Sequence, residues 1–231
     1  MNSPLCVSLH ASPEQIVRLK ALQASFAEVC NALAPLVQQT RCWQRVTLHH
    51  LAYRDLRARF PQVGSQMVCN AIYSVSRTCR VVFQHPQSPW NASRDPSRPL
   101  PLLRFLSGSP VYFDRHTLSL KEGKLSMYTL DGRMHFQISL SEADQKRFRE
   151  DKLREVVLSE TVAGFQLTFF LVNEGQAQEA ESSDLRNLEL PEYVVVETAD
   201  VLSASNSWPS IEVADAGPGQ VEPGKSVHEI L

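Results

Sequence analysis

The chain has 231 residues, 43% hydrophobic and 21% charged, which is enough for one substantial core or two small ones. No apolar run approaches the length of a membrane span, and the N-terminus has neither the basic nor the hydrophobic region of a signal peptide. We therefore expect a cytosolic (cytoplasmic) protein with no membrane partner.

The net charge of −2 conceals a strong asymmetry along the chain. Residues 1–154 contain 21 Lys and Arg against 11 Asp and Glu, a net charge of +10, whereas residues 155–231 contain 2 against 14, a net charge of −12. Such blocks indicate a basic, partner-binding body followed by an acidic tail. From Arg41 to Arg115 every basic residue is Arg, which favours nucleic acid because guanidinium binds phosphate bidentately. A GC-rich genome would produce the same bias without any function.

The first elements expected are a strand and a long helix. Residues 5–10 are short and apolar enough for a strand. Ser12–Gln15 then provides an N-cap serine, a proline in the first turn and the glutamine of a capping box, so a helix begins there. Its apolar residues recur every three or four positions as far as Leu33. We expect Pro35 to disturb this helix and residues 36–46 to connect it to the next one.

Residues 47–83 predict two amphipathic helices separated by a turn at 61–65. The first of them places its apolar residues and Tyr53 on one arc. The opposite arc is basic and contains His50, Arg54 and Arg57.

The second of these helices combines an apolar seam with a polar stripe. Val68, Ile72 and Val75 begin a seam, at steps of four and three, that indicates burial. Polar residues at similar steps fall on the far side of the helix, and their amide, aromatic and guanidinium groups suit a phosphate backbone with unstacked bases. This stripe consists of Gln66, Asn70, Tyr73, Arg77 and Arg80. A solvated helix face beside a core explains the same pattern equally well.

After the helices the sequence changes to loops and strands. Residues 84–101 are rich in proline, which indicates a linker or ordered loop with Trp90 as an anchor. Beyond them the hydrophobic period falls to two. Asp131–Gly132, between alternating runs at 124–130 and 133–140, predicts a β-hairpin. Further short strands are expected at 109–114, 117–120, 156–160 and 165–172, with a charged surface helix starting at Ser141.

The predicted fold class is therefore α+β: a small antiparallel, OB-like β-barrel with an inserted three-helix lobe. We expect residues 5–10 and 102–172 to form the barrel and residues 12–83 to form the lobe. Residues 173–231 are acidic and short of apolar residues, so we expect a connector, an edge strand at Tyr193–Glu197 and a disordered tail.

Cysteine and histidine usage gives no sign of a metal or cofactor site. The five cysteines are odd in number and widely spaced, so reduced thiols are expected rather than disulfides. No CxxC pair, phosphate-binding glycine loop or nucleophile elbow occurs, and His49–His50 has no acid or cysteine at metal-ligand spacing. We therefore predict no cofactor.

The order of these parts resembles the N-terminal half of TnpB, the OrfB-type transposon-associated protein related to compact type V CRISPR effectors. The resemblance covers residues 5–172. It rests on the opening strand with SPEQ, on LHHLAYRDLRARFPQVGSQMVCNAIYSVSRTCR, and on KLSMYTLDGRMHF with the later FQLTFFLVNEG. In that family the corresponding blocks build an OB-like wedge barrel and recognition helices that hold a guide RNA and help to read target DNA. The resemblance implies RNA, and RNA-guided target DNA, as partners.

The chain departs from that family after residue 172. Where the RuvC nuclease of the family would begin, this chain has ELPEYVVVETADVLSASN, and the family's later acidic residues and cysteine pairs are absent. Asp200 follows an apolar run, but one carboxylate cannot assemble a two-metal centre. The resemblance therefore implies a nuclease-lacking protein that is not an enzyme.

The candidate nucleic-acid-binding residues combine the two helices with two further arginines: His50, Tyr53, Arg54, Arg57, Asn70, Tyr73, Arg77, Arg80, Arg104 and Arg115. Two other hypotheses remain open. The acidic C-terminal region favours a subunit or adaptor of a CRISPR- or transposon-associated assembly whose nuclease half is on another chain. The third hypothesis is a decayed transposon fragment without a present function.

Overall fold

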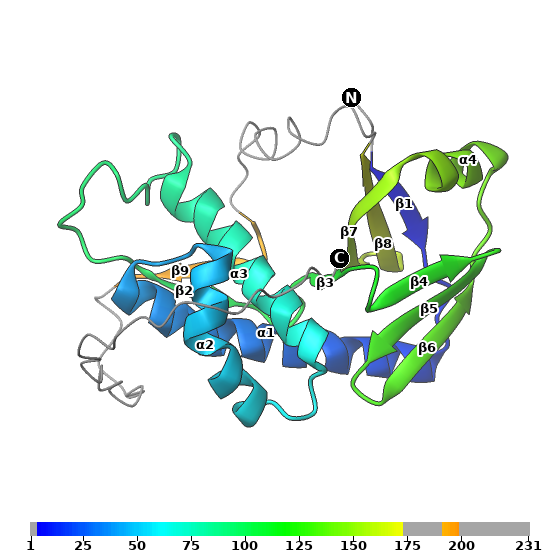
Figure 1. Cartoon of the computed structure of the whole chain (residues 1–231), viewed down its shortest axis with the longest axis horizontal. Coiled ribbons are helices and arrows are strands. Elements are labelled where there is room, and N and C mark those ends of the chain that lie inside the picture. Colours follow the sequence, from blue (N-terminus) through cyan, green and yellow to red (C-terminus); the bar gives the residue numbers. More distant parts are fainter. Residues whose placement is uncertain (1–3, 173–190, 199–231) are drawn as a thin grey trace, which may run out of the picture.

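The computed structural model describes residues 4–172 and 191–198. Helices α1, α2 and α3 gather at one side and most of the antiparallel strands at the other, with α1 running beneath both parts (Figure 1). The α+β class is confirmed. The expectations for residues 173–190 and 199–231, including the disordered tail and Asp200, lie outside the described residues.

Helix α1 (Pro13–Thr40) begins as predicted and ends later. The capping box is confirmed, because the amide of Gln15 donates to Ser12 Oγ at 3.3 Å and the amide of Ser12 donates to Gln15 Oε1 at 2.9 Å. The prediction that Pro35 disturbs the helix is wrong, since α1 continues through it. Leu36–Val37 beyond the proline are buried, and their burial offsets the backbone hydrogen bond that proline removes.

Helices α2 (Arg45–Arg59) and α3 (Ser65–Gln84) pack on α1 and on each other. The apolar seam predicted for α3 is confirmed, because Val68, Ile72 and Val75 are each at most 1% exposed. These side chains join the core that the three helices share.

Two antiparallel sheets form the other part of the molecule. The first has the order β1-β8-β7-β3, with β1 at Leu5–Ser8, β8 at Gly164–Val172, β7 at Lys152–Thr161 and β3 at Val111–Phe113. The second has the order β4-β5-β6, with β4 at Leu118–Lys121, β5 at Lys124–Thr129 and β6 at Gly132–Gln137. The hairpin predicted at Asp131–Gly132 is confirmed, because Thr129 pairs with Gly132, whose φ of +105° favours glycine.

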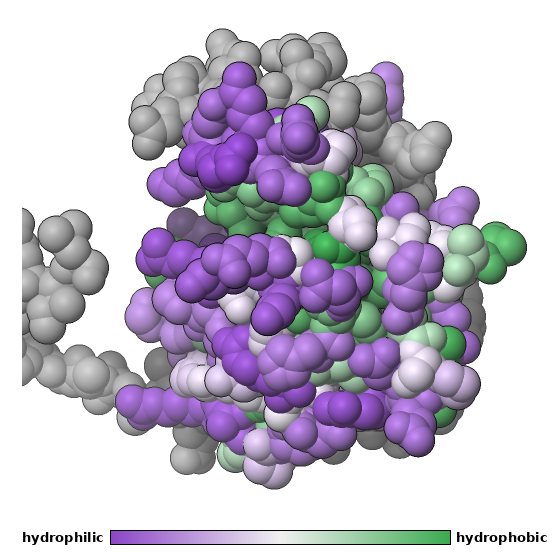
Figure 2. Space-filling view, turned by 90° about the vertical axis from the view of Figure 1, so that its right-hand side faces the viewer, coloured by the Kyte–Doolittle hydropathy of each residue, from purple (hydrophilic) through white to green (hydrophobic). Residues whose placement is uncertain are grey.

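The two sheets do not close into a barrel within the described residues, since no strand pairing joins them. Their facing sides contribute to one core, with Phe169 and Leu158 from the first sheet and Leu125 and Met127 from the second. On the end of the molecule that carries α4 (Glu142–Glu150) and strands β4–β6, an apolar band lies between two polar regions (Figure 2). Because no strand pairing joins the two sheets, the predicted barrel is not confirmed.

Strand β2 (Leu102–Phe105) lies with the helices rather than with either large sheet. It pairs with β9 (Val194–Glu197), the edge strand predicted at 193–197. The Asn31 side chain of α1 donates to the Phe105 carbonyl at 2.9 Å and accepts from the Phe105 amide at 2.7 Å. Strand β2, which the predicted bounds assign to the barrel, therefore packs on α1.

The other expected elements are present with shifted bounds. The proline-rich segment after α3 is an ordered loop, in which Trp90 packs against the core and carries the Arg98 guanidinium 4.9 Å above its ring centre. The charged surface helix is α4, capped by Ser141. Strand β7 begins at Lys152 rather than at residue 156, so its first residues were wrongly assigned to the helix.

All five cysteines are free thiols, as predicted. Cys30 and Cys79 are buried between the helices, and burial raises the pKa of both thiols far above the ordinary range. These two residues therefore act as small apolar core side chains. No helix in the described part of the chain is long and apolar enough to cross a bilayer.

Candidate nucleic-acid interface

One face of α2 carries the basic arc that the sequence predicts. His50, Arg54 and Arg57 of this arc form the α2 stripe together with Tyr53, which was expected on the apolar arc. Its members are three or four positions apart and therefore share one side of the helix. His50 and Arg54 are exposed, and Arg54 has no hydrogen-bond or ion-pair partner among the described residues. The Tyr53 ring stacks on His49 with 4.6 Å between centroids. The Arg57 guanidinium donates to the Val63 carbonyl in the following turn.

The polar stripe of α3 lies against the first sheet, not toward solvent. Asn70 is 5% exposed and donates to the Tyr112 carbonyl at 3.0 Å. The Tyr73 hydroxyl donates to Glu155 at 2.8 Å, and Arg77 forms an ion pair with the same carboxylate. The expectation that Asn70, Tyr73 and Arg77 form an open binding face is therefore wrong, because β3 packs on that side of α3 and Glu155 of β7 accepts hydrogen bonds from it.

The remaining candidates are scattered. Arg80 is half-buried near the end of α3 and has no partner among the described residues. Arg104 is exposed on β2 and pairs with Glu197 of β9 at 3.3 Å. Arg115 lies in the turn after β3, where its Nε donates to His116 at 3.4 Å. The four α2 residues therefore lie together on one face of the helix. Arg104 and Arg115 lie on other elements, and neither forms a hydrogen bond with the α2 residues within the described part of the chain.

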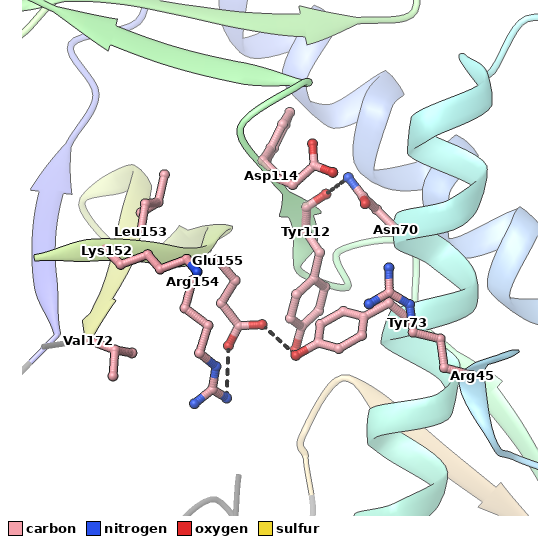
Figure 3. A pocket seen from close by; sticks show the side chains of 11 residues that line it. Arg45, Asn70, Tyr73, Tyr112, Asp114, Lys152, Leu153, Arg154, Glu155 and Val172 are labelled. Atoms are coloured by element: carbon pink, nitrogen blue, oxygen red, sulfur yellow. Dashed lines mark hydrogen bonds and ion pairs between the residues drawn. The ribbon is translucent and has the colours of Figure 1, made fainter. Parts of the chain in front are cut away.

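A pocket of about 400 Å³ lies where α3 faces strands β3 and β7 (Figure 3). Helix side chains line one wall and β7 side chains the opposite wall, with β3 between them. Its charged and aromatic lining includes Arg45, Tyr73, Tyr112, Lys152, Arg154 and Glu155.

An irregularity in β7 shapes this pocket. Leu153 pairs with Leu171 and Glu155 with Phe170, so Arg154 is an extra residue in the ladder. In a regular strand, consecutive side chains point to opposite faces. Here Arg154 and Glu155 both line the pocket, because the bulge redirects one of them.

Glu155 is the centre of the charge network beside the pocket. It is 4% exposed and accepts from Tyr73 and Arg77, while the Arg154 guanidinium lies 3.8 Å from Oε1. Burial, followed by the charge of Glu155, raises the pKa of Tyr73. Tyr73 therefore remains a neutral hydrogen-bond donor at physiological pH. The network attaches α3 to β7 and neutralises the carboxylate.

Two other cations of the pocket form no ion pair with a carboxylate within the described residues. Arg45 packs over the Tyr73 ring at 5.1 Å, and Lys152 is exposed; neither forms an ion pair within the described residues. The other carboxylate of the pocket, Asp114, is already engaged by Gln66 at 2.6 Å and by backbone amides of its own turn. The pocket consequently has an excess of positive charge.

Helix α2 contributes residues both to the α2 stripe and to the pocket. Burial raises the pKa of the Cys69 thiol at the start of α3, and the charges of Arg45 and Arg57 act in the opposite direction. Arg45, in the first turn of α2, lines the pocket, and Arg57, near the other end of the helix, ends the α2 stripe.

Most of the residues that line this pocket were not predicted from the sequence. Arg45, Lys152, Arg154 and Glu155 were not among the candidate residues. A signal existed in the charged run 152–155 directly before the apolar Val156–Leu158, which is unusual inside a strand, but it was assigned to the surface helix. No group of three or more His, Cys, Asp or Glu in the described ranges is arranged to hold a metal ion.

Comparison of the chain with known protein families and with curated proteins found no match. The fold and site define an α+β protein with a basic surface that carries aromatic side chains.

Proposed function

We propose that this chain is an RNA-binding protein of the TnpB-like type that lacks a nuclease and acts by occupying its target. The observation that carries the proposal is the α2 stripe, where exposed His50 and Arg54 lie beside the stacked Tyr53. Phosphate contacts by arginine and stacking on aromatic rings are the two interactions with which proteins bind single-stranded RNA.

Electrostatics supports a polyanionic partner. Arg54, Arg45 and Lys152 have no acidic partner in the described part of the chain, so each can release counterions from a phosphate backbone. Helix α2 contributes to both places, since Arg45 in its first turn lines the pocket while the α2 stripe continues along the helix to Arg57. Guide-bound target DNA is the further partner that the TnpB resemblance adds to this proposal.

The test is RNA binding across a salt series. We expect Arg54→Gln to weaken binding of a single-stranded RNA and to reduce the slope of log affinity against log salt by roughly 0.7, the value for one phosphate contact. Arg149→Gln, at an exposed arginine of α4, is the matched control and should change neither quantity. Fluorescence anisotropy measures both. If Arg54→Gln behaves like the control, the α2 stripe is a solvated surface and the proposal fails.

A second candidate function is a subunit or adaptor that binds protein. Residues 173–231 contain 12 Asp and Glu against 2 Lys and Arg, which suits a basic partner surface. The apolar band beside α4 offers a second contact (Figure 2). Purification from the native host, followed by nuclease treatment, discriminates the two functions: an adaptor keeps its stoichiometric protein partner, whereas an RNA-binding protein loses its RNA.

A further inference from the structure

The pocket between α3 and β7 has the charge of a site for a dianion. Arg45, Lys152, Arg154 and the adjoining Arg77 supply four cations against the carboxylates of Asp114 and Glu155, which leaves a formal charge of +2. Both carboxylates are engaged in hydrogen bonds or ion pairs within the protein. Arg77 and Arg154 are held by Glu155, so Arg45 and Lys152 are the pocket cations that a ligand can use.

The size and lining of the pocket also limit the ligand. A volume of about 400 Å³ lies within the range of about 300–1,000 Å³ that is usual for small-molecule sites. The aromatic rings of Tyr73 and Tyr112 meet edge to face at 5.7 Å, and Leu153 and Val172 add apolar surface to the opposite wall. The pocket thus offers apolar surface for a flat ring beside cations for an anion.

We infer that this pocket binds one nucleotide through its terminal phosphate, with the phosphate between Arg45 and Lys152 and the nucleoside against the apolar lining. A terminal phosphate carries about −1.5 to −2 charges at neutral pH, whereas a phosphodiester within a chain carries one, so the terminal group matches the pocket charge better. The bulge in β7 contributes by turning Arg154 toward the same space. If the bound nucleotide is the 5′ end of an RNA, this inference rests on the proposed RNA-binding function. If it is a free nucleotide, the inference is independent of that function.

The first experiment uses free nucleotides and the full chain. Isothermal titration calorimetry with uridine and adenosine 5′-monophosphates should detect binding, and the matching nucleosides should bind at least tenfold more weakly. Lys152→Gln and Arg45→Gln should each weaken nucleotide binding by about tenfold or more, because each removes a charge-assisted contact. Both residues are exposed, so the variants should melt at the wild-type temperature. Lys124→Gln, at an exposed lysine of β5, is the control.

The second experiment separates the two sources of the phosphate. Short RNAs with a 5′-phosphate or a 5′-hydroxyl are compared in wild type and Lys152→Gln. Tighter binding of the phosphorylated RNA that Lys152→Gln abolishes assigns the pocket to RNA ends. Equal binding of the two RNAs, together with nucleotide binding that depends on Lys152, assigns the pocket to free nucleotides. Both results support a nucleotide pocket.

The inference is overturned when nucleoside monophosphates do not bind at millimolar concentration and the two RNAs bind equally. It is also overturned when Lys152→Gln and Arg45→Gln match the Lys124→Gln control. Failure of the proposed function is a separate result. If RNA binding depends on Arg54 but the 5′-phosphate has no effect and nucleotides do not bind, the RNA-binding function stands and the nucleotide pocket is rejected. If nucleotides bind but RNA does not, the nucleotide pocket stands and the RNA-binding function is rejected.

Discussion

At the scale of single residues, Glu155 is a buried carboxylate whose charge must be compensated by several partners. A carboxylate that is 4% exposed loses most of its hydration, and the loss must be offset by partners. Tyr73, Arg77 and Arg154 together provide this compensation. These residues come from α3 and β7, so the pairing of one charge also fixes the junction between the helices and the first sheet.

Removing that charge should destabilise the protein strongly. Glu155→Gln leaves Arg77, whose side chain is 22% exposed, without its buried counter-charge, and we expect the free energy of unfolding to fall by roughly 3 kcal/mol or more. Tyr73→Phe removes one hydrogen bond to the carboxylate and should cost about 1–3 kcal/mol. Urea denaturation followed by circular dichroism measures both. A loss below 1 kcal/mol for Glu155→Gln would show that the network is not a stabilising one.

A second residue-scale prediction concerns pH. The Arg18 guanidinium donates to Asp131 at 2.7 Å and so, with help from Thr129, lowers the pKa of that carboxyl. A lowered folded-state pKa means that the contribution to stability is present above the unfolded value, ~3.9, and is lost as the pH falls through the folded value. The difference in melting temperature between wild type and Asp131→Asn should therefore shrink below about pH 4. A difference that stays constant from pH 7 to pH 3 contradicts this.

At the scale of elements, local patterns were sufficient for prediction. The capping box at Ser12–Gln15, the seam on α3 and the Asp131–Gly132 hairpin each depend on a few neighbouring residues, and each is confirmed. Half of strand β7, residues 156–160, was predicted, but its charged start was assigned to a helix. A charged run is ordinarily exposed, and only the bulge and the pocket explain why it lies in this strand.

The sequence did not allow us to predict which strand packs against which face of a helix. Tyr73 and Glu155 are 82 positions apart in the sequence. The periodicity of α3 does not indicate that a carboxylate of β7 lies opposite the polar stripe of the helix. The same polar pattern fits a solvated face, a nucleic-acid interface and a buried network. On α2 the predicted basic residues His50 and Arg54 are exposed, and no contact of this helix with a strand appears among the main element contacts of the described residues.

Pro35 allows a prediction about α1. A proline within a helix removes one backbone hydrogen bond and costs up to about 3 kcal/mol relative to alanine. Since α1 remains helical to Thr40, Pro35→Ala should raise the free energy of unfolding by about 1–3 kcal/mol. Chemical denaturation measures the change, with Ala32→Ser, at a neighbouring half-buried position of α1, as a comparison substitution. A destabilised Pro35→Ala variant would mean that packing of the proline ring outweighs its backbone cost.

At the scale of the whole molecule, the candidate site lies where two parts of the chain meet. Helix α1 extends beneath both parts, and its Arg18 reaches the β5–β6 hairpin while Asn31 holds β2 (Figure 1). The pocket is lined from α2, α3, β3, β7 and β8, so neither part contains it alone. A ligand in this position binds both parts and should stabilise their junction, which links nucleotide binding to thermal stability.

The charge asymmetry of the chain gives the last prediction. Residues 199–231 are rich in Pro, Gly and Ser and poor in core-forming residues, so their deletion should leave the melting temperature nearly unchanged. That segment contains five acidic residues and one lysine, and its removal changes the net charge from −2 to +2. RNA affinity at low salt should then rise by roughly two- to tenfold through long-range attraction.

The gain should fade as salt is raised, because the screening length falls to about 10 Å at 0.1 M salt. A full-length variant with the five acids replaced by amides separates charge from chain length, and it should reproduce the gain. Its substitutions are Asp200→Asn, Glu212→Gln, Asp215→Asn, Glu222→Gln and Glu229→Gln. Anisotropy titrations at two salt concentrations measure the effect. If the deletion lowers RNA affinity, the acidic segment contributes to binding rather than opposing it, and the division into a basic body and an opposing acidic tail is wrong.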